Sequence, residues 1–190
     1  MRLHASLTLA LTAYLSTQGA QSIFADDAYH IDYHHALLGA PQPSTTFFHA
    51  PYSGSKASLL YTLSSNHIVG AVNPKDGTLV WRHAFKAPSS SRNETDTQGF
   101  LRAGEGMDTV VGAVGEDIRA WSAADGRLIW EGRFAGGEVG DLEVVEEERG
   151  EGNTGGEVKD VIVLLEDAVQ AVKRLDGKTG LVKWTYQDTR

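Results

Sequence analysis

The chain has 190 residues, of which 41% are apolar and 8% aromatic, a composition that suits one globular domain with a sizeable core. Its formal net charge of −8 argues against nucleic-acid binding, because phosphate contacts require clustered Lys and Arg. The absence of cysteine excludes disulfides, thiolate zinc sites and thiol nucleophiles, although a secreted domain with an adequate core needs no disulfide.

The first segment of the chain has the features of a secretory signal. Arg2 and His4 precede an apolar run over residues 7–15, and small and polar residues follow it. A basic start, a short apolar run and small residues at the cleavage region are typical of a signal peptide, and this run is too short to span a bilayer. We predict a signal peptide over residues 1–25, with the cleavage position left open; the alternative is a buried N-terminal strand or helix.

An internal repeat organises the remainder of the chain. Segments 69–81, 118–130 and 172–184 align without a gap, and each ends on a tryptophan that follows a glycine by four positions. The repeated pairs are Gly77 with Trp81, Gly126 with Trp130, and Gly180 with Trp184. Such self-similarity is the signature of stacked units, each of which buries its apolar face only against a neighbour.

Each repeat carries the pattern of a β-hairpin. Alternating apolar residues lead into a turn that starts with Asn, Ser or Asp and contains Asp-Gly or Thr-Gly, where glycine supplies the positive φ of a tight turn. Further apolar runs lie upstream, at 46–48 with 58–63, at 109–114, and at 142–145 with 161–165. Three or four short strands in about 40–50 residues are typical of propeller blades.

We therefore predict an all-β fold, a partial β-propeller of about three blades that follows the signal peptide. The incomplete propeller is expected to span residues 26–190, with repeats centred on 45–83, 100–131 and 140–185. A ring closes with about 4–8 blades, so roughly three blades leave one face of the first blade and one face of the last blade without a neighbour.

The repeated tryptophans are expected to pack between neighbouring blades. Trp81 and Trp130 should be buried there, whereas Trp184 should matter less because no further blade covers it. The open face of the last blade should expose apolar surface that includes residues 181–184, and such surface promotes association.

Two resemblances to known families rest on these residues. The pattern Ala-x-Asn-x-x-Asp-Gly-x-Leu-x-Trp over residues 71–81, with its two further copies, resembles the repeat of quinoprotein-alcohol-dehydrogenase-type propellers. That repeat is typical of a fold and indicates little about function. Residues 26–34, the run 36–49 and the segment 58–63 with the hairpin after it resemble the start of a fungal subunit 1 of the endoplasmic reticulum membrane protein complex. The resemblance covers an N-terminal portion of that family only.

The second resemblance implies a non-catalytic lumenal propeller on a transmembrane subunit of a complex that inserts membrane proteins into the endoplasmic reticulum membrane. It implies as partners the other subunits of the complex and lumenal segments of client proteins. It also implies an endoplasmic reticulum lumen location, with membrane association only through a C-terminal part beyond this chain.

Two alternative functions stay open. A lumenal sensor domain of a stress-response kinase uses such repeats, but the kinase would follow downstream and this chain lacks it. A quinone-dependent dehydrogenase fragment would share the repeat, but members of that family stack a disulfide of adjacent cysteines on the quinone, and this chain has no cysteine.

The sequence contains no residues to which we assign a catalytic, cofactor-binding or metal-binding role. Acidic and histidine residues gather in segment 26–35, but the adjacent His34 and His35 point to opposite sides of a strand, so an exposed polar segment is the preferred interpretation. No nucleophile elbow is present, and Gly104-Glu105-Gly106 lacks the third glycine of a phosphate-binding loop. We predict no enzyme activity and no cofactor.

Two predicted loops stand out by composition. Residues 86–98 have no apolar period and contain the glycosylation sequon Asn93-Glu94-Thr95, so Asn93 is expected to carry a glycan in a chain that enters the secretory route. Residues 146–157 are rich in glutamate and glycine, which predicts a flexible, solvated insertion; a partner-binding acidic tip is the alternative.

Overall fold

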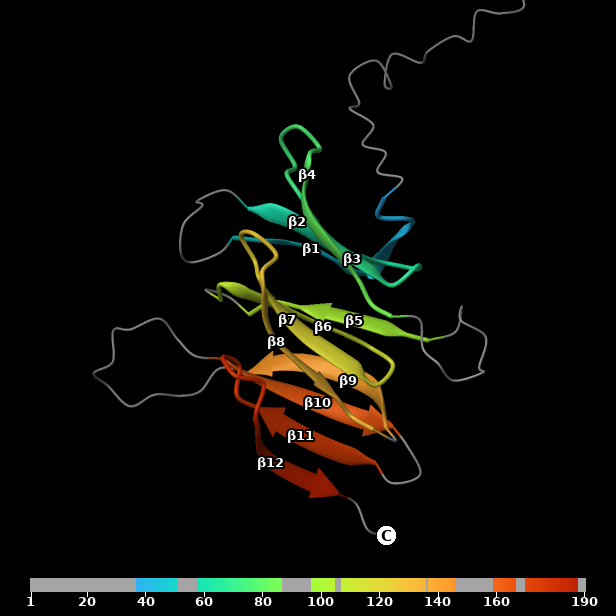
Figure 1. Ribbon diagram of the computed structural model, residues 1–190, viewed down its shortest axis with the longest axis vertical. Helices are drawn as coiled ribbons and strands as arrows, with labels where there is room; N and C mark the ends of the chain where they lie inside the picture. The colour runs from blue at the N-terminus through green and yellow to red at the C-terminus, as the bar shows by residue number, and fades with distance from the viewer. Residues whose placement is uncertain are drawn as a thin grey trace, which may run out of the picture. The chain divides into compact units, whose positions relative to one another are not determined.

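Three four-stranded antiparallel sheets make up the described part of the computed structural model (Figure 1). The structure describes residues 37–50, 58–86, 97–104, 107–135, 137–145, 159–166 and 170–187, and these contain no helix. All of them belong to one unit, His35–Arg190. In each sheet the strands pair in chain order, so that every sheet is a simple meander.

The first sheet consists of β1 (Pro41–His49), β2 (Leu59–Ser64), β3 (Ile68–Val72) and β4 (Leu79–Ala84). The second consists of β5 (Gly99–Arg102), β6 (Thr109–Val114), β7 (Asp117–Ser122) and β8 (Leu128–Arg133). The third consists of β9 (Glu138–Val145), β10 (Asp160–Glu166), β11 (Ala171–Leu175) and β12 (Val182–Gln187). The first strand of each sheet lies beside the first strand of the next, since β1 contacts β5 and β5 contacts β9.

The core lies in two layers between successive sheets. One cluster joins the first and second sheets and includes Tyr61, Leu63, Trp81 and Trp121. The other joins the second and third sheets and is built mainly from Val and Leu around Trp130. Strands that are buried on both faces read as continuous apolar runs, which explains why β2 and β6 are buried along nearly their whole length.

The predicted all-β class is confirmed, and the structure adds detail that the apolar runs did not give. Strand β1 begins at Pro41, several residues before the predicted run, and a register shift between Pro41 and Thr46 lets it continue. Strand β5 was not predicted, because its four residues are too few to show a period of two. The predicted signal peptide lies outside the described residues.

Candidate functional site

The outer hairpin turn, which joins the third and fourth strands of each sheet, has the same hydrogen bonds in all three copies. It spans residues 73–78, 122–127 and 176–181. In every copy the first amide donates to the sixth carbonyl and the fifth amide donates to the first carbonyl, at 2.8–2.9 Å. The fifth residue is the repeated glycine, with φ of +69°, +72° and +71° in turn. Only glycine adopts this backbone conformation without strain.

Aspartate side chains brace the first two turns. The Oδ1 atom of Asp76 accepts hydrogen bonds from the amide and the hydroxyl of Thr78, at 2.9 and 2.7 Å, and these bonds hold the pKa of Asp76 below its usual value. In the second turn the Ser122 hydroxyl and the Arg127 amide donate to Asp125 and lower the pKa of Asp125 in the same way. Both carboxylates therefore stabilise their turns in the charged form.

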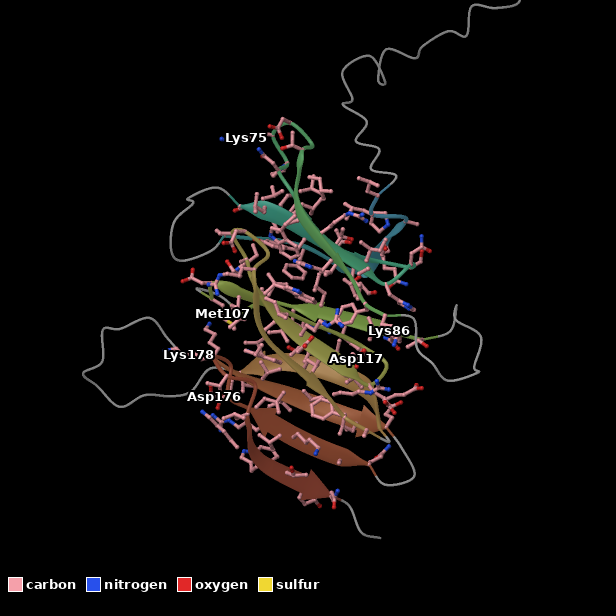
Figure 2. All side chains as sticks on the ribbon, in the orientation of Figure 1. Lys75, Lys86, Met107, Asp117, Asp176 and Lys178 are labelled. Atoms are coloured by element: carbon pink, nitrogen blue, oxygen red, sulfur yellow. The ribbon has the colours of Figure 1, made fainter. Side chains whose placement is uncertain are left out.

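The third turn is braced from a different position. Asp176, the first residue of that turn, accepts from the amides of Lys178 and Thr179 at 3.1 and 2.9 Å and from the Thr179 hydroxyl at 2.9 Å. Burial pulls the pKa of Asp176 upward, but these hydrogen bonds outweigh it and the pKa is lowered. Figure 2 labels Lys75 in the first turn and Asp176 and Lys178 in the third.

The tryptophan of the first sheet docks onto the turn of the second sheet. Trp81 is 7% exposed, and its indole Nε1–H donates to the Ala123 carbonyl at 3.0 Å. A Cβ atom on Gly126 would lie 2.5 Å from Cγ of Trp81, closer than Cβ atoms approach other atoms in proteins. The glycine therefore has two roles, because it supplies the turn conformation and also makes room for the indole of the preceding sheet.

The second sheet repeats this interface against the third sheet. Trp130 is also 7% exposed, and its indole Nε1–H donates to the Gly177 carbonyl at 3.0 Å. A Cβ atom on Gly180 would lie 2.6 Å from Cε3 of Trp130. In both interfaces the carbonyl that accepts the indole N–H belongs to the residue three positions before the glycine, so the two interfaces have the same geometry. The burial expected for Trp81 and Trp130 is confirmed.

The first interface carries extra polar aromatic contacts. Tyr61 is fully buried, and its hydroxyl donates to the same Ala123 carbonyl at 2.8 Å; burial raises the pKa of Tyr61 to about 12, which keeps the hydroxyl protonated. His83 stacks on Trp121 with an interplanar angle of 13°, and its Nε2 lies 2.6 Å from the Gly126 carbonyl oxygen. The first two sheets are therefore tied by directional bonds as well as by apolar packing.

The tryptophan of the third sheet is exposed, unlike those of the first two sheets. Trp184 is 41% exposed, and Leu181, Val182 and Tyr186 beside it are 70%, 48% and 63% exposed. Every residue of β12 is exposed. This confirms the expected open apolar face of the last sheet. It is the largest contiguous group of exposed large apolar residues along one strand in the described part of the chain.

With this geometry in view, comparison with known proteins identifies the family. Residues 22–190 match the family described as the EMC1 N-terminal beta-propeller domain. The chain belongs to this family. Its three sheets are therefore blades of a β-propeller, as the repeat predicted. The chain is also 29% identical over 121 residues to the ER membrane protein complex subunit 1 of Xenopus laevis, an alignment covering 64% of this chain and 11% of that protein.

Two solved structures of other proteins are similar to the chain at low sequence identity. A europium-containing methanol dehydrogenase matches 70% of this chain and 23% of its own at 14% identity, with a TM-score of 0.49. The quinohemoprotein alcohol dehydrogenase of Comamonas testosteroni matches 78% and 23% at 19% identity, with a TM-score of 0.46. Neither likeness is close enough to support an inference about activity.

A buried charged group in the third sheet of this EMC1-family chain was not found from the sequence. Asp160 is fully buried, and its carboxylate binds Nζ of Lys183 at 2.8 and 2.9 Å and Nε of Arg174 at 2.6 Å. The three residues come from β10, β11 and β12, so one carboxylate ties the outer strand to the two strands inside it. A buried carboxylate needs such partners, because an unpaired charge is strongly disfavoured there.

The other predicted sites lie largely outside the described residues. Asn93, segment 26–35 and the acidic segment 146–157 are not described, so their proposed roles stay predictions. Among the residues that are described, no three His, Asp or Glu side chains gather closely enough to hold a metal ion. The same part of the chain contains no helix long and apolar enough to cross a membrane.

Several residues of the blade interfaces were missed because their signal is not local. Tyr61 stands in an ordinary apolar run, and its acceptor lies 62 positions further along the chain. His83 follows Trp81 by two positions in a strand, which places both on one face, but only the fold brings Trp121 against them. The recurrence of the tryptophan itself was the one signal in the sequence that pointed to this interface.

Proposed function

We propose that this chain is a non-catalytic lumenal propeller region of the endoplasmic reticulum membrane protein complex, and that it supports the insertion of membrane proteins. The observation that carries the proposal is the family match over residues 22–190, which includes all three blades. The chain spans about a tenth of the length of the curated relative, so the activity of a whole subunit is a further step in the same proposal.

The blade structure supports a scaffolding role. Both internal interfaces are closed by an indole–carbonyl bond and a glycine in contact with the ring, so the blades form a rigid stack. The charged side chains of the described strands are mostly paired with each other, as Arg102 is with Asp141 and Glu143, and Arg133 with Glu116. A rigid surface of this kind is suited to holding partner subunits in place. We propose as partners the other subunits of the complex and lumenal segments of its clients.

The alternative functions find no specific observation in their favour. The dehydrogenase structures resemble the chain only in fold, and fold similarity does not transfer function. The family match gives no support to a stress-sensing kinase. We therefore propose a single function.

Co-purification from the native host tests this proposal. An affinity tag is placed on the protein encoded by the gene, the endoplasmic reticulum membranes are solubilised in mild detergent, and the bound proteins are identified by mass spectrometry. We expect the other subunits of the complex in stoichiometric amounts, together with impaired insertion of multi-spanning membrane proteins when the gene is deleted. Recovery of the protein without those subunits, with client insertion unchanged in the deletion strain, would refute the proposal.

A further inference from the structure

The segment just before β1 forms a strap on the first sheet, on the face that points away from the second sheet. Strand pairing sets Gly70 of β3 beside Arg82 of β4. Their neighbours along the strands, Ala71 and Trp81, lie in the core shared with the second sheet, so Gly70 and Arg82 belong to the opposite face. The strap, residues 37–40, contacts both of them and is the blue start of the coloured ribbon in Figure 1.

A buried leucine anchors the strap in a socket whose floor is a glycine. Leu38 precedes the first strand and is nevertheless only 3% exposed. A Cβ atom added to Gly70 would overlap Cδ2 of Leu38, and it would lie 3.6 Å from Cδ1 of Leu79, which forms a wall of the socket. Any side chain at position 70 would therefore compete with Leu38 for the same space.

Hydrogen bonds hold the strap on both sides of this anchor. Nη1 of Arg82 donates to the Leu37 carbonyl at 3.0 Å. The amide of Ser65, in the turn between β2 and β3, donates to the Ala40 carbonyl at 3.1 Å. Gly39, with a φ of +78°, turns the chain between these two carbonyls. The strap is thus attached to β4 at one end, to the β2–β3 turn at the other, and to β3 in the middle.

The socket is specific to the first of the three described sheets. The repeat places Arg119 of the second sheet and Lys173 of the third at the position of Gly70. Both cations pack on a phenylalanine of the preceding sheet, Arg119 on Phe85 at 5.1 Å and Lys173 on Phe134 at 5.5 Å from the ring centroid. A long side chain at that position leaves no room for a strap, so the glycine at position 70 is suited to Leu38 and not required by the repeat.

The strap lies outside the packed core of the sheets. Leu38 belongs to neither of the two core clusters, and Leu37 beside it is 57% exposed. A segment with few buried apolar contacts opens at a lower free energy than the strands beneath it. Opening would uncover Gly70 and Leu79 on the same face as Phe48, which strand pairing places there and which is 65% exposed.

We propose that residues 37–40 are a latch, a strap that opens and closes on the first sheet independently of the sheets themselves. Leu38 is its anchor and Gly70 is its socket. In this structure the latch is closed and covers Gly70 and the side of Leu79. When it opens, this strip joins the exposed Phe48, and the exposed apolar area of the face increases. The latch is a conformational device that is independent of the function proposed above.

Hydrogen–deuterium exchange of the full chain, followed by mass spectrometry, tests the latch. Peptides from residues 37–44 and from the β2–β3 turn report on it, because the Ser65 amide is bonded to the Ala40 carbonyl, while β6 and β10 report on the folded sheets. We expect Leu38→Ala to speed exchange of the reporter peptides about tenfold or more and to leave β6 and β10 protected. The matched control is Leu37→Ala, because this neighbouring leucine is exposed, and there exchange should not change.

A second variant tests the socket without removing the leucine. Gly70→Ala adds one methyl group where Cδ2 of Leu38 lies, so it should release the strap and speed exchange as Leu38→Ala does. In the double variant, Gly70→Ala should add nothing to Leu38→Ala, because the atoms that would overlap are gone. Such non-additivity is expected of two residues that share one contact. Binding of an apolar fluorescent dye should rise in both single variants and stay unchanged in Leu37→Ala.

Three results would overturn the proposal. One is equal exchange of the reporter peptides in Leu38→Ala and Leu37→Ala, since Leu38 would then not anchor the strap. Another is an effect of Gly70→Ala that is the same with and without the Leu38 side chain. The third is faster exchange of β6 and β10 together with the strap, because the strap would then unfold with the core and would not be a latch.

Discussion

Replacing Trp130 with alanine measures how strongly the indole joins the second and third sheets. The side chain is 7% exposed and lies in the core between these sheets, so the substitution opens a cavity there. It also deprives the Gly177 carbonyl of its indole donor. Truncation of a large buried aromatic costs about 3–5 kcal/mol, and the lost hydrogen bond places this one toward the upper end. Trp184→Ala is the matched control, because the same residue type stands at the same repeat position but is 41% exposed.

Urea unfolding followed by far-UV circular dichroism gives the free energy of unfolding of each variant. We expect Trp130→Ala to lower it by about 3–5 kcal/mol and Trp184→Ala by less than about 2 kcal/mol, in proportion to the smaller buried surface. A conservative Trp130→Phe variant should recover most of the packing but not the bond to Gly177. If the two alanine variants proved equally destabilising, the repeated tryptophan would not act through the following sheet, and the interface rule would be wrong.

Three further predictions follow from the turns and the sequon. Gly126→Ala should lower the free energy of unfolding by about 1–3 kcal/mol, because it strains a left-handed position and pushes Cβ into Trp81, and thermal melts will show the loss. Asp76, Asp125 and Asp176 have lowered pKa values in the folded state, so their contribution to the free energy of unfolding is fully present above the ordinary pKa of about 4. That contribution is lost as the pH falls through the lowered pKa values, so the denaturation midpoint should be lower at pH 3 than at pH 7. In the native host the signal should be removed and Asn93 glycosylated, so that endoglycosidase shifts the wild-type band on a gel but leaves the Asn93→Gln band unmoved.

The repeat was readable from sequence because its requirements are local in each copy. Each copy shows the same sequence pattern: a turn-forming residue, then a glycine, and a tryptophan four positions after the glycine. Strand alternation then assigns Trp81, Trp130 and Trp184 to equivalent faces of their sheets. The order of the repeats along the chain predicts that the next sheet covers Trp81 and Trp130. The burial of the first two and the exposure of the third agree with that argument.

The features that the sequence did not predict depend on contacts between residues far apart in the chain. Gly126 also contacts the ring of Trp81, which lies 45 positions earlier in another sheet, and the local sequence around Gly126 does not indicate this contact. The buried Asp160 looked like one acidic residue among many near the acidic segment, and only the strand register brings Arg174 and Lys183 onto it. The contact between Leu38 and Gly70 likewise joins distant positions, and the early start of β1 at Pro41, with its register shift, was not evident from the sequence.

The two roles of Gly126 and Gly180 explain why the glycine turn and the tryptophan recur together in the repeat. A tryptophan without the glycine turn would leave its indole ring exposed. A glycine turn without the tryptophan would leave its carbonyl without the indole donor and the space beside the glycine unfilled. The turn of the second sheet receives the ring of the first sheet, and the turn of the third sheet receives the ring of the second, so successive sheets are joined by a directional contact. The two outer sheets differ in this respect, because Leu38 packs over Gly70 of the first sheet, whereas Trp184 of the third sheet is exposed.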